Sequence, residues 1–289
     1  MESGARRRLS GIVVVGALAA FVFGGIAAAY GARVEQSGDF ALLDGTAKID
    51  SKFWTEPSNR LSATLRVRQF QPNGKPILSY ELDMQKLVHM IVVRDDFGTF
   101  AHLHPAFDAA TGTFRQPFTK DPNHRYYVYA DTTPQGVGQQ VFRFTLDSTG
   151  AAASAARPND RSQPTVAAGP YTVALGTTSL ASGVAQRLNV TIQKDGKPAD
   201  DLGTYLGAAA HCVFINTQSL AYIHIHPSVR GAGMQMSMNS DAKMEMSGGP
   251  AGPLLEMSLP SLPPGFYKLW IEFRGGEKVY TAPFTLRVR

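Results

Sequence analysis

The sequence has very little cysteine, no concentrated positive charge beyond its first ten residues, and no helical periodicity after about residue 32. The single cysteine, Cys212, excludes an internal disulfide and any zinc site built from cysteines alone. Of the formal net charge of +5, Arg6, Arg7 and Arg8 less Glu2 contribute +2, which leaves +3 for the rest of the chain. A chain with so little concentrated positive charge is not expected to bind nucleic acid.

An uncharged apolar segment follows the N-terminal arginines. It runs for 22 residues from Gly11 to Ala32, which is long enough to span a bilayer. Because arginines before such a segment stay in the cytoplasm, everything from about Arg33 onward should lie outside it. The small residues Ala27 to Ala29 leave open a cleaved signal peptide in place of an anchor. We expect residues 1–35 to be a signal or transmembrane anchor. The chain would then be a single-pass protein of the cell membrane, with its folded part periplasmic or extracellular.

The folded part contains an internal duplication. Seven identities recur at an offset of 122 residues over 32 positions without a gap. The turn Gly74-Lys75-Pro76 returns at 196–198. The other shared positions are three histidines and a proline: His89, His102, His104 and Pro105 in the first copy, and His211, His224, His226 and Pro227 in the second. Further on, residues 126–131 align with residues 267–272 at an offset of 141, so the second copy has a 19-residue insertion after its proline.

Both copies consist of short segments rich in β-branched and aromatic residues, separated by glycine, proline, asparagine or aspartate. This pattern predicts an all-β fold with two tandem immunoglobulin-like β-sandwich modules after the N-terminal helix. The expected boundaries are residues 36–147 for the first module, 148–169 for a flexible linker, and 170–289 for the second, which carries a Met-rich insertion at 228–254.

The spacing of the histidines predicts a site. If residues 95–98 form a four-residue hairpin loop, His89 lies opposite His104, and a loop at 217–220 places His211 opposite His226 in the same way. Residues two apart on a strand share a face, so each module presents three imidazoles on one face. The prolines that follow should end the strands at a sheet edge. Each module is therefore expected to bind one metal ion through its triad, and the alternative is a structural histidine cluster.

Sulfur-containing residues near the histidines bear on which metal is bound. Imidazole suits copper and zinc, whereas thioether sulfur selects Cu(I). Met90 and Cys212 directly follow histidines, and five methionines fall in the insertion: Met234, Met236, Met238, Met244 and Met246. Copper, as Cu(I) or Cu(II), is the expected cofactor, and zinc is the second choice. The alternative for the methionines is an adaptable apolar surface loop. His124 has no counterpart in the repeat and is expected to be a loop residue.

The histidine segments resemble those of secreted or membrane-tethered bacterial proteins with tandem YtkA-like modules. The resemblance rests on residues 86–93 and 100–105 in the first module, and on 205–213, 223–227 and 265–270 in the second. It extends over about residues 60–147 and 170–289, and the Met-rich insertion departs from it. It implies a small extracytoplasmic copper-handling type of sandwich, with metal binding or an accessory role in the cell envelope.

An enzyme is not expected, and no catalytic residue is assigned. The sequence has no nucleophile elbow, phosphate loop or dinucleotide fingerprint, and we find no carboxylate near the histidines that recurs in both modules to act as a general base. The alternative function is a structural or interaction module of a cell-envelope complex without bound metal, whose partner would be an envelope protein docked on an exposed sheet edge.

Overall fold

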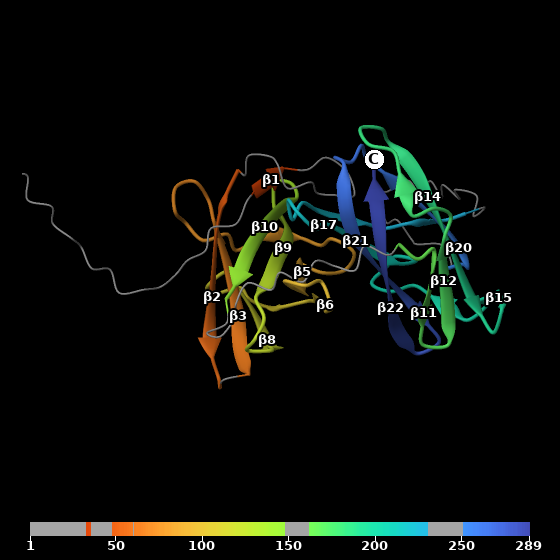
Figure 1. Ribbon diagram of the computed structural model, residues 1–289. Helices are drawn as coiled ribbons and strands as arrows, with labels where there is room; N and C mark the ends of the chain where they lie inside the picture. Colours follow the sequence, from red (N-terminus) through yellow and green to blue (C-terminus); the bar gives the residue numbers. More distant parts are fainter. Residues whose placement is uncertain (1–32, 36–47, 60, 148–161, 231–250) are drawn as a thin grey trace, which may run out of the picture.

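The computed structural model describes residues 33–35, 48–59, 61–147, 162–230 and 251–289, and all of its regular elements are β-strands (Figure 1). The all-β prediction is therefore confirmed. The expected N-terminal helix lies outside these residues. Within them, the structure has no helix of the length and apolar character needed to cross a membrane.

Residues 33–147 form module 1, which has two sheets. One contains, in spatial order, β1 (Arg33–Glu35), β10 (Gln140–Leu146), β9 (Tyr126–Pro134), β5 (Val88–Arg94) and β6 (Phe100–Leu103), with β4 (Tyr80–Glu81) paired to β9. The other contains β2 (Asp50–Pro57), β3 (Ser62–Phe70), β8 (Thr113–Thr119) and β7 (Ala106–Asp108). Buried apolar residues from both sheets form one core, so the module is a β-sandwich.

Residues 162–289 form module 2, which is built in the same way. Its first sheet contains β11 (Thr165–Ala168), β12 (Tyr171–Leu175), β14 (Gln186–Lys194), β20 (Leu254–Leu259) and β19 (Ser228–Val229), with β15 (Lys197–Pro198) on β14. Its second contains β13 (Ser179–Leu180), β22 (Lys278–Val288), β21 (Gly265–Gly275), β17 (His211–Asn216) and β18 (Tyr222–Ile225), with β16 (Leu202–Gly203) on β21. Among the described strands, no sheet takes members from both modules.

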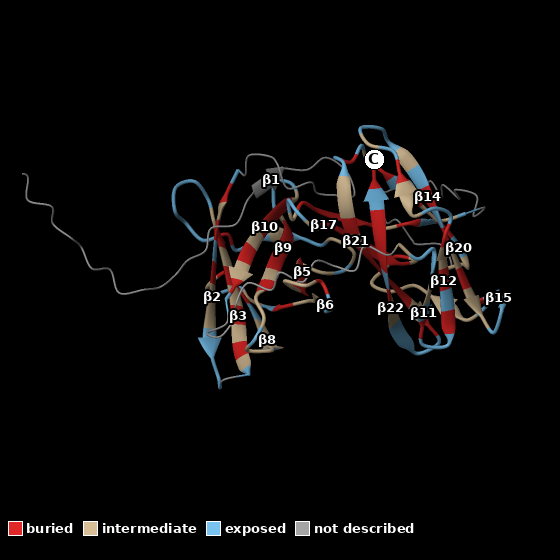
Figure 2. Cartoon of the chain, in the orientation of Figure 1, coloured by how far each residue is buried: buried red, intermediate tan, exposed pale blue. Residues whose placement is uncertain are grey.

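The burial pattern of the strands shows how the two modules meet. Strand β3 alternates buried and half-buried residues, as expected when one face packs on a core and the other faces solvent. Strands β5 and β17 are instead buried on both faces (Figure 2). Met90 and Val92 of β5 pack inside module 1. Ile91 and Val93, which alternate with them and face the other side, belong to a separate apolar cluster with residues of module 2. The modules therefore dock on each other through these sheets.

Aromatic rings dominate this interface and obey an approximate twofold symmetry. Phe100 of module 1 stacks on Trp270 of module 2 with ring centroids 4.8 Å apart. The equivalent residues with the modules exchanged are Tyr222 and Tyr129, and these stack at 4.9 Å. An interface is isologous when both partners use the same surface patch, so that every contact occurs twice with the partners exchanged, as in a symmetric dimer. The duplicated modules pack on each other as the two copies in such a dimer do.

Three strands fall in segments that were expected to lie outside the sheets of the modules. Strand β11 falls inside the segment expected to be a linker, because it pairs with β12 and completes a sheet of module 2. Strand β19 falls inside the segment 228–254 expected to be an insertion, and it pairs with β20. At the other end, β1 pairs with β10 of module 1, although its residues were expected in the anchor segment.

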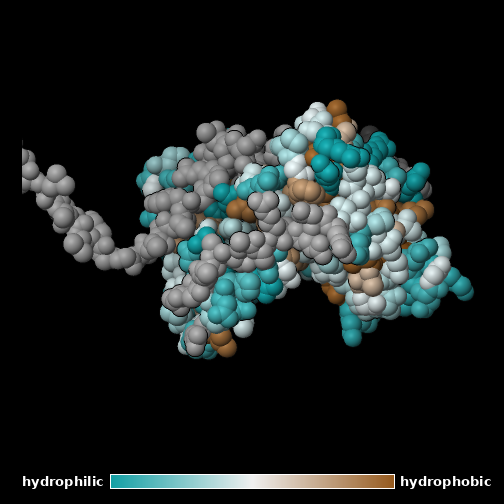
Figure 3. All heavy atoms as spheres, in the orientation of Figure 1, coloured by the Kyte–Doolittle hydropathy of each residue, from teal (hydrophilic) through white to brown (hydrophobic). Residues whose placement is uncertain are grey.

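The described residues expose no large apolar patch that would compete as a site. The large hydrophobic side chains that are exposed are scattered over both modules: Leu61, Leu78, Leu82, Val184, Leu254 and Val279. On the face drawn in Figure 3, hydrophilic and weakly hydrophobic residues cover most of the described surface, with hydrophobic ones interspersed. Isolated exposed residues of this kind are normal for a folded chain.

Candidate metal centre

The hairpins β5–β6 and β17–β18 hold the histidines in the predicted register. Met90 pairs with Leu103 and Cys212 with Ile225, which places His89 opposite His104 and His211 opposite His226. Both β6 and β18 are edge strands, and both end one residue before the last histidine of each triad, where Pro105 and Pro227 follow. The histidine face of each hairpin is the face that docks on the other module.

The two triads therefore meet and form one group, which we call the histidine cluster: His89, His102, His104, His211, His224 and His226. The ring of His89 lies 5.0 Å from that of His224 and 5.7 Å from that of His211, between ring centroids. The ring of His102 lies 5.3 Å from that of His211. The expectation of two separate sites, one per module, is thus not what the structure shows, because docking brings the two faces together.

Four members of the histidine cluster have converging nitrogens. One ring nitrogen of each of His89, His102, His211 and His224 lies within 4.8 Å of the corresponding nitrogen of the other three. His89 Nδ1 and His102 Nε2 are 2.8 Å apart, and His211 Nδ1 and His224 Nε2 are 3.2 Å apart. Two nitrogens bound at about 2.0–2.1 Å to a tetrahedral ion lie about 3.3 Å apart. The four imidazoles therefore fit one four-coordinate ion with small adjustments.

The outer nitrogens of two of these rings are anchored by backbone carbonyls. His89 Nε2–H donates to the Asp83 carbonyl at 3.0 Å, and His211 Nε2–H donates to the Tyr205 carbonyl at 3.0 Å. Because a carbonyl only accepts, each Nε2 carries the proton and each Nδ1 presents its lone pair to the centre. Histidine ligands of metal ions are commonly oriented by such an outer hydrogen bond.

These carbonyls belong to two equivalent tight turns, at 83–86 and 205–208. The central residues of both turns have positive φ: Met84 and Gln85 at 40° and 68°, and Leu206 and Gly207 at 50° and 82°. Only glycine adopts this conformation without strain, so three non-glycine residues pay a cost there. The strained turns fix the carbonyls that hold the histidine rings.

Two buried carboxylic acids complete the surroundings of the histidine cluster. Asp131 on β9 pairs with His89 on β5, and Glu272 on β21 pairs with His211 on β17, in equivalent ladder positions. Each side chain reaches a histidine of the opposite module. Glu272 Oε2 lies 2.6 Å from His102 Nδ1, and Asp131 Oδ2 lies 3.6 Å from His224 Nδ1.

These two acids correct the expectation that no carboxylate recurs beside the histidines of both modules. The alignment of residues 126–131 with 267–272 equates Asp131 with Glu272. The pairing of β9 with β5 and of β21 with β17, which cannot be read from the sequence, brings these acids next to the histidines.

Burial controls the charge of the histidine cluster. It lowers the pKa of His89 and lowers that of His102, His211 and His224 well below the usual value. It also lowers the pKa of His104 to about 4 and that of His226 to about 3. Burial also raises the pKa of Asp131 and of Glu272 to about 8. In the absence of an ion, the six imidazoles are therefore neutral at pH 7 and present lone pairs, which is the state that metal ions bind.

Two buried nitrogens in the histidine cluster have no hydrogen-bond partner within the described part of the chain: Nε2 of His104 and Nδ1 of His224. His226 Nε2 lies 3.1 Å from His211 Nδ1. A buried polar atom without a partner costs about 1–3 kcal/mol, so such atoms are expected where a ligand is to be bound. His104 and His226 flank the four converging nitrogens and supply further donors next to them.

The sulfur-containing residues that follow the histidines point away from the site. Met90 lies in the core of module 1 and Cys212 in the core of module 2, both with 0% exposure. Because successive residues of a strand face opposite sides, neither can share a ligand set with the preceding histidine. The predicted methionine ligands, Met234, Met236, Met238, Met244 and Met246, lie outside the described residues.

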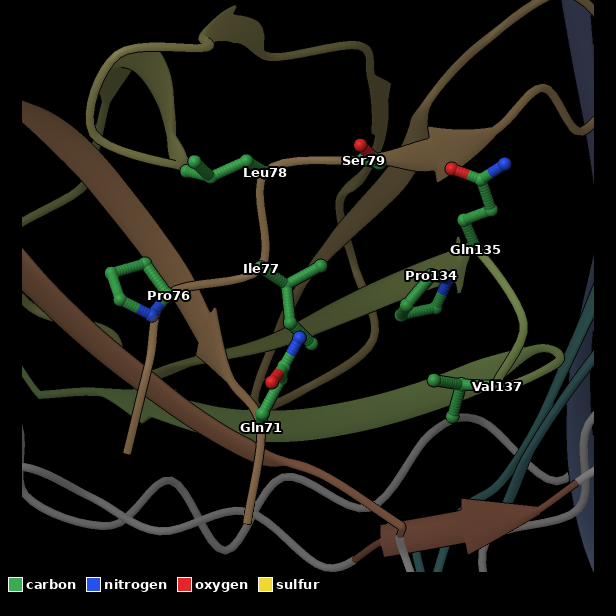
Figure 4. Close-up of a pocket in the computed structure, with 8 residues that line it drawn as sticks. All are labelled: Gln71, Pro76, Ile77, Leu78, Ser79, Pro134, Gln135 and Val137. Carbon is green, nitrogen blue, oxygen red and sulfur yellow. The ribbon is translucent and has the colours of Figure 1, made fainter. Parts of the chain in front are cut away.

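Two other features of module 1 are weaker candidates. Asp95, Asp96 and His124 lie close together, but His124 Nδ1 bonds to Asp95 at 2.9 Å and Asp96 bonds to Arg94, so the group is already paired. A surface pocket of about 430 Å³ has no titratable side chain in its lining, which consists of Gln71, Pro76, Ile77, Leu78, Ser79, Pro134, Gln135 and Val137 (Figure 4). The histidine cluster is therefore the candidate site.

Two solved structures are among those with a resemblance to the chain. A chimeric titin Z1Z2-Z1Z2 tandem is 12% identical, with 81% of this chain and 99% of that chain covered and a TM-score of 0.17. Domains 4 and 5 of the S-layer protein SbsC are 12% identical, with 90% and 99% covered and a TM-score of 0.22. At such TM-scores neither resemblance supports a conclusion about this chain.

No curated protein matches the sequence. Residues 165–289 match the model of a family described as a domain of unknown function, DUF8832. The matched segment is module 2 from β11 to the last residue, and it includes His211, His224, His226 and Glu272. It therefore contains half of the histidine cluster.

Proposed function

We propose that this chain is a metal-binding protein whose two modules together hold one late transition-metal ion in the histidine cluster. One observation carries the proposal: four imidazole nitrogens, two from each module, lie within 4.8 Å of one another. The anchored outer nitrogens of His89 and His211 and the unpartnered Nε2 of His104 support it. The histidine cluster would supply a ready set of neutral ligands with little rearrangement.

Copper is the metal that we propose, with zinc as the second choice. An all-imidazole set suits both ions, and the general order of stability for divalent first-row metals places Cu(II) above Zn(II). The proposal includes the expected location: an N-terminal anchor in the cell membrane and two immunoglobulin-like modules outside the cytoplasm, with no enzymatic activity. In this setting the protein would capture or hold copper in the cell envelope.

The Met-rich segment has a separate place in this proposal. Its five methionines suit Cu(I), so they would act on the reduced ion, whereas the imidazoles take the oxidised one. Deleting residues 234–246 should weaken Cu(I) uptake and leave Cu(II) and Zn(II) uptake unchanged. An equal loss for all three ions would mean that the segment supports the fold and not the metal.

The experiment that tests the function measures metal binding to the full chain in detergent. Wild type and the His102→Ala and His224→Ala variants are titrated with Cu(II) and Zn(II) in competition with a chelator of known affinity. We expect each substitution to lower the affinity for the single bound ion by about 100-fold, since each removes a ligand of the same site. His124→Ala is the matched control, because His124 is a hydrogen-bonded histidine outside the histidine cluster. It should bind metal like wild type.

A purely structural role for the histidine cluster is the competing function. The 2.8 Å contact of His89 with His102 favours it, because neutral imidazoles can hydrogen-bond to one another without an ion. In that case the chain would be an interaction module of the envelope, and its partner would be a protein. Wild-type protein would then bind no divalent ion in the titration, and the histidine substitutions would lower only the free energy of unfolding.

A further inference from the structure

Two buried acidic side chains, Asp131 and Glu272, lie beside the histidine cluster. Within the described residues, Asp131 and Glu272 are the acidic side chains that are buried, with 2% and 8% exposure. The basic side chains found against them in this part of the chain are His224 and His102, and not a lysine or arginine. Burying an acidic group without a lysine or arginine partner is costly to the fold and needs an explanation.

The remaining contacts of these side chains hold them in place. Gln139 donates to Asp131 Oδ1 at 2.7 Å, and the Tyr222 hydroxyl donates to Asp131 Oδ2 at 3.3 Å. Thr281 donates to Glu272 Oε1 at 3.4 Å. These donors fix the carboxyl groups where each faces a histidine of the other module, which is the position of an outer partner of a metal ligand.

The positions of Asp131 and Glu272 affect which charge of ion the histidine cluster can hold. The imidazoles of the histidine cluster are neutral ligands, so an ion bound there brings its full charge into a buried site. The two acids are neutral without an ion and become carboxylates beside a bound cation. Two carboxylates offset the charge of a divalent ion completely, whereas a monovalent ion leaves one negative charge without compensation. Glu272 as a carboxylate also accepts the Nδ1–H of His102, which directs the lone pair of His102 Nε2 toward the centre, and Asp131 faces His224 Nδ1 at 3.6 Å.

We propose that Asp131 and Glu272 are positioning residues that make the histidine cluster prefer divalent over monovalent metal ions, each acting on a histidine of the opposite module. This inference rests on the proposed function. It gives the ion in the histidine cluster a definite class, a divalent late transition metal such as Cu(II), and it separates this site from any Cu(I) ligands in the Met-rich segment.

The test compares affinities for ions of different charge. The full chain is titrated with Cu(II), with Zn(II) and, under anaerobic reducing conditions, with Cu(I), as wild type and as the Asp131→Asn and Glu272→Gln variants and their combination. To keep the Met-rich segment out of the Cu(I) measurement, each protein also carries Met→Leu substitutions at residues 234, 236, 238, 244 and 246. We expect the combined variant to lose about 100-fold in affinity for both divalent ions and less than about tenfold for Cu(I).

Two controls make the result specific. Asp95→Asn alters a carboxylate that is bonded to His124, outside the histidine cluster, and should change no affinity. Asp131→Glu extends the carboxylate toward His224 and should retain or tighten divalent binding, while the spectrum of bound Cu(II) shifts as the ligand is reoriented. Thermal unfolding without metal identifies any variant that fails to fold, in which case Asp131→Glu and Glu272→Asp supply the comparison.

The outcomes separate this inference from the function on which it rests. Wild-type protein that binds no divalent ion would overturn the proposed function. Wild-type protein that binds such ions, with equal losses for Cu(I) and Cu(II) or no loss in the carboxamide variants, would overturn the role of Asp131 and Glu272 alone.

Discussion

The two halves of the histidine cluster have the same ligands but different outer partners. Glu272 of module 2 reaches His102 at 2.6 Å, whereas Asp131 of module 1, one methylene shorter, stays 3.6 Å from His224. As a result His102 Nδ1 is hydrogen-bonded and His224 Nδ1 has no hydrogen-bond partner within the described residues. The duplicated hairpin thus keeps its histidines in one register while the groups that orient them differ.

The turns that hold the rings differ in a similar way. Module 2 has Gly207 at the second central position of its turn, where module 1 has Gln85, although both positions have positive φ. The same backbone shape is therefore free of strain at this position in one module and strained in the other. The comparison shows that the geometry of the carbonyl and the ring has priority over local propensity at this site.

The largest expected effect concerns the aromatic pairs that dock the modules. Replacing Trp270 by Ala removes a side chain with 3% exposure from its stack with Phe100 and should lower the free energy of unfolding by about 3–5 kcal/mol. The equivalent change, Tyr129→Ala, should cost a similar amount because the interface is nearly symmetric. Urea unfolding followed by tryptophan and far-ultraviolet signals measures both. A loss below about 1 kcal/mol for either would mean that the modules do not dock as described.

The next effect is the pH dependence of the metal-free protein. The histidine pKa values are lowered on folding, so their contribution to stability is present above pH 6.5 and is lost as pH falls toward about 4 for His104 and about 3 for His226. The pKa values of Asp131 and Glu272 are raised to about 8, so their contribution is lost as pH rises toward that value. Six histidines outweigh two carboxylic acids on the acid side.

The metal-free protein should therefore be most stable near pH 6.5, and urea midpoints between pH 4 and pH 9 measure this. Each histidine contributes to the loss of stability between pH 6.5 and its own pKa. Replacing His226 by Gln should therefore remove part of this loss down to about pH 3, and replacing His104 by Gln only down to about pH 4. Stability that rises steadily from pH 6.5 to pH 9 would contradict the burial of the two carboxylic acids.

A smaller effect is expected from exchanging the turn residues. Gln85→Gly should raise the free energy of unfolding by about 1 kcal/mol, because it removes the cost of a left-handed conformation. Gly207→Gln should lower it by about the same amount. Thermal unfolding of the two single variants checks the pair, and equal effects of the same sign would show that the turns are not equivalent.

The smallest effect on metal binding is expected at the residues that follow the histidines. Cys212→Ala and Met90→Leu change the cores of the two modules, so each should cost about 1 kcal/mol of stability or less. Neither should alter the affinity for copper, because both side chains face away from the histidine cluster. Chelator competition measures the affinity, and a tenfold loss in either variant would return that sulfur to the ligand set.

The arrangement of the histidine triad within each module can be predicted from the sequence. The docking that joins the two triads cannot. The spacing of His89, His102 and His104 predicts the hairpin, its four-residue loop and the shared face, because strand periodicity is a local property. The strands Asp50–Pro57 and Thr113–Thr119 do not stand out in the sequence, because charged and polar residues occupy their exposed faces. The docking of the modules depends on Ile91, Val93 and the residues of module 2 that they contact. In the sequence these residues indicate a strand buried on both faces, but they do not show what covers it.

The contacts across the interface show the same limit. The offset of 141 already equates Asp131 with Glu272, but it does not reveal that each side chain faces the opposite module. A symmetric contact between duplicated modules is a property of the assembled surface, so it becomes visible only when both sheets are placed together.

The number of metal ions bound per chain tests the central claim most directly, namely that the two modules form one site. The full chain with methionines 234–246 replaced by leucine is loaded with Cu(II), freed of excess ion by gel filtration and analysed for copper and protein by elemental mass spectrometry. A shared site predicts one copper per chain in this protein, and close to none after either His102→Ala or His224→Ala. Two coppers per chain, each lost separately on substitution in one module, would contradict the shared site, as would no bound copper at all.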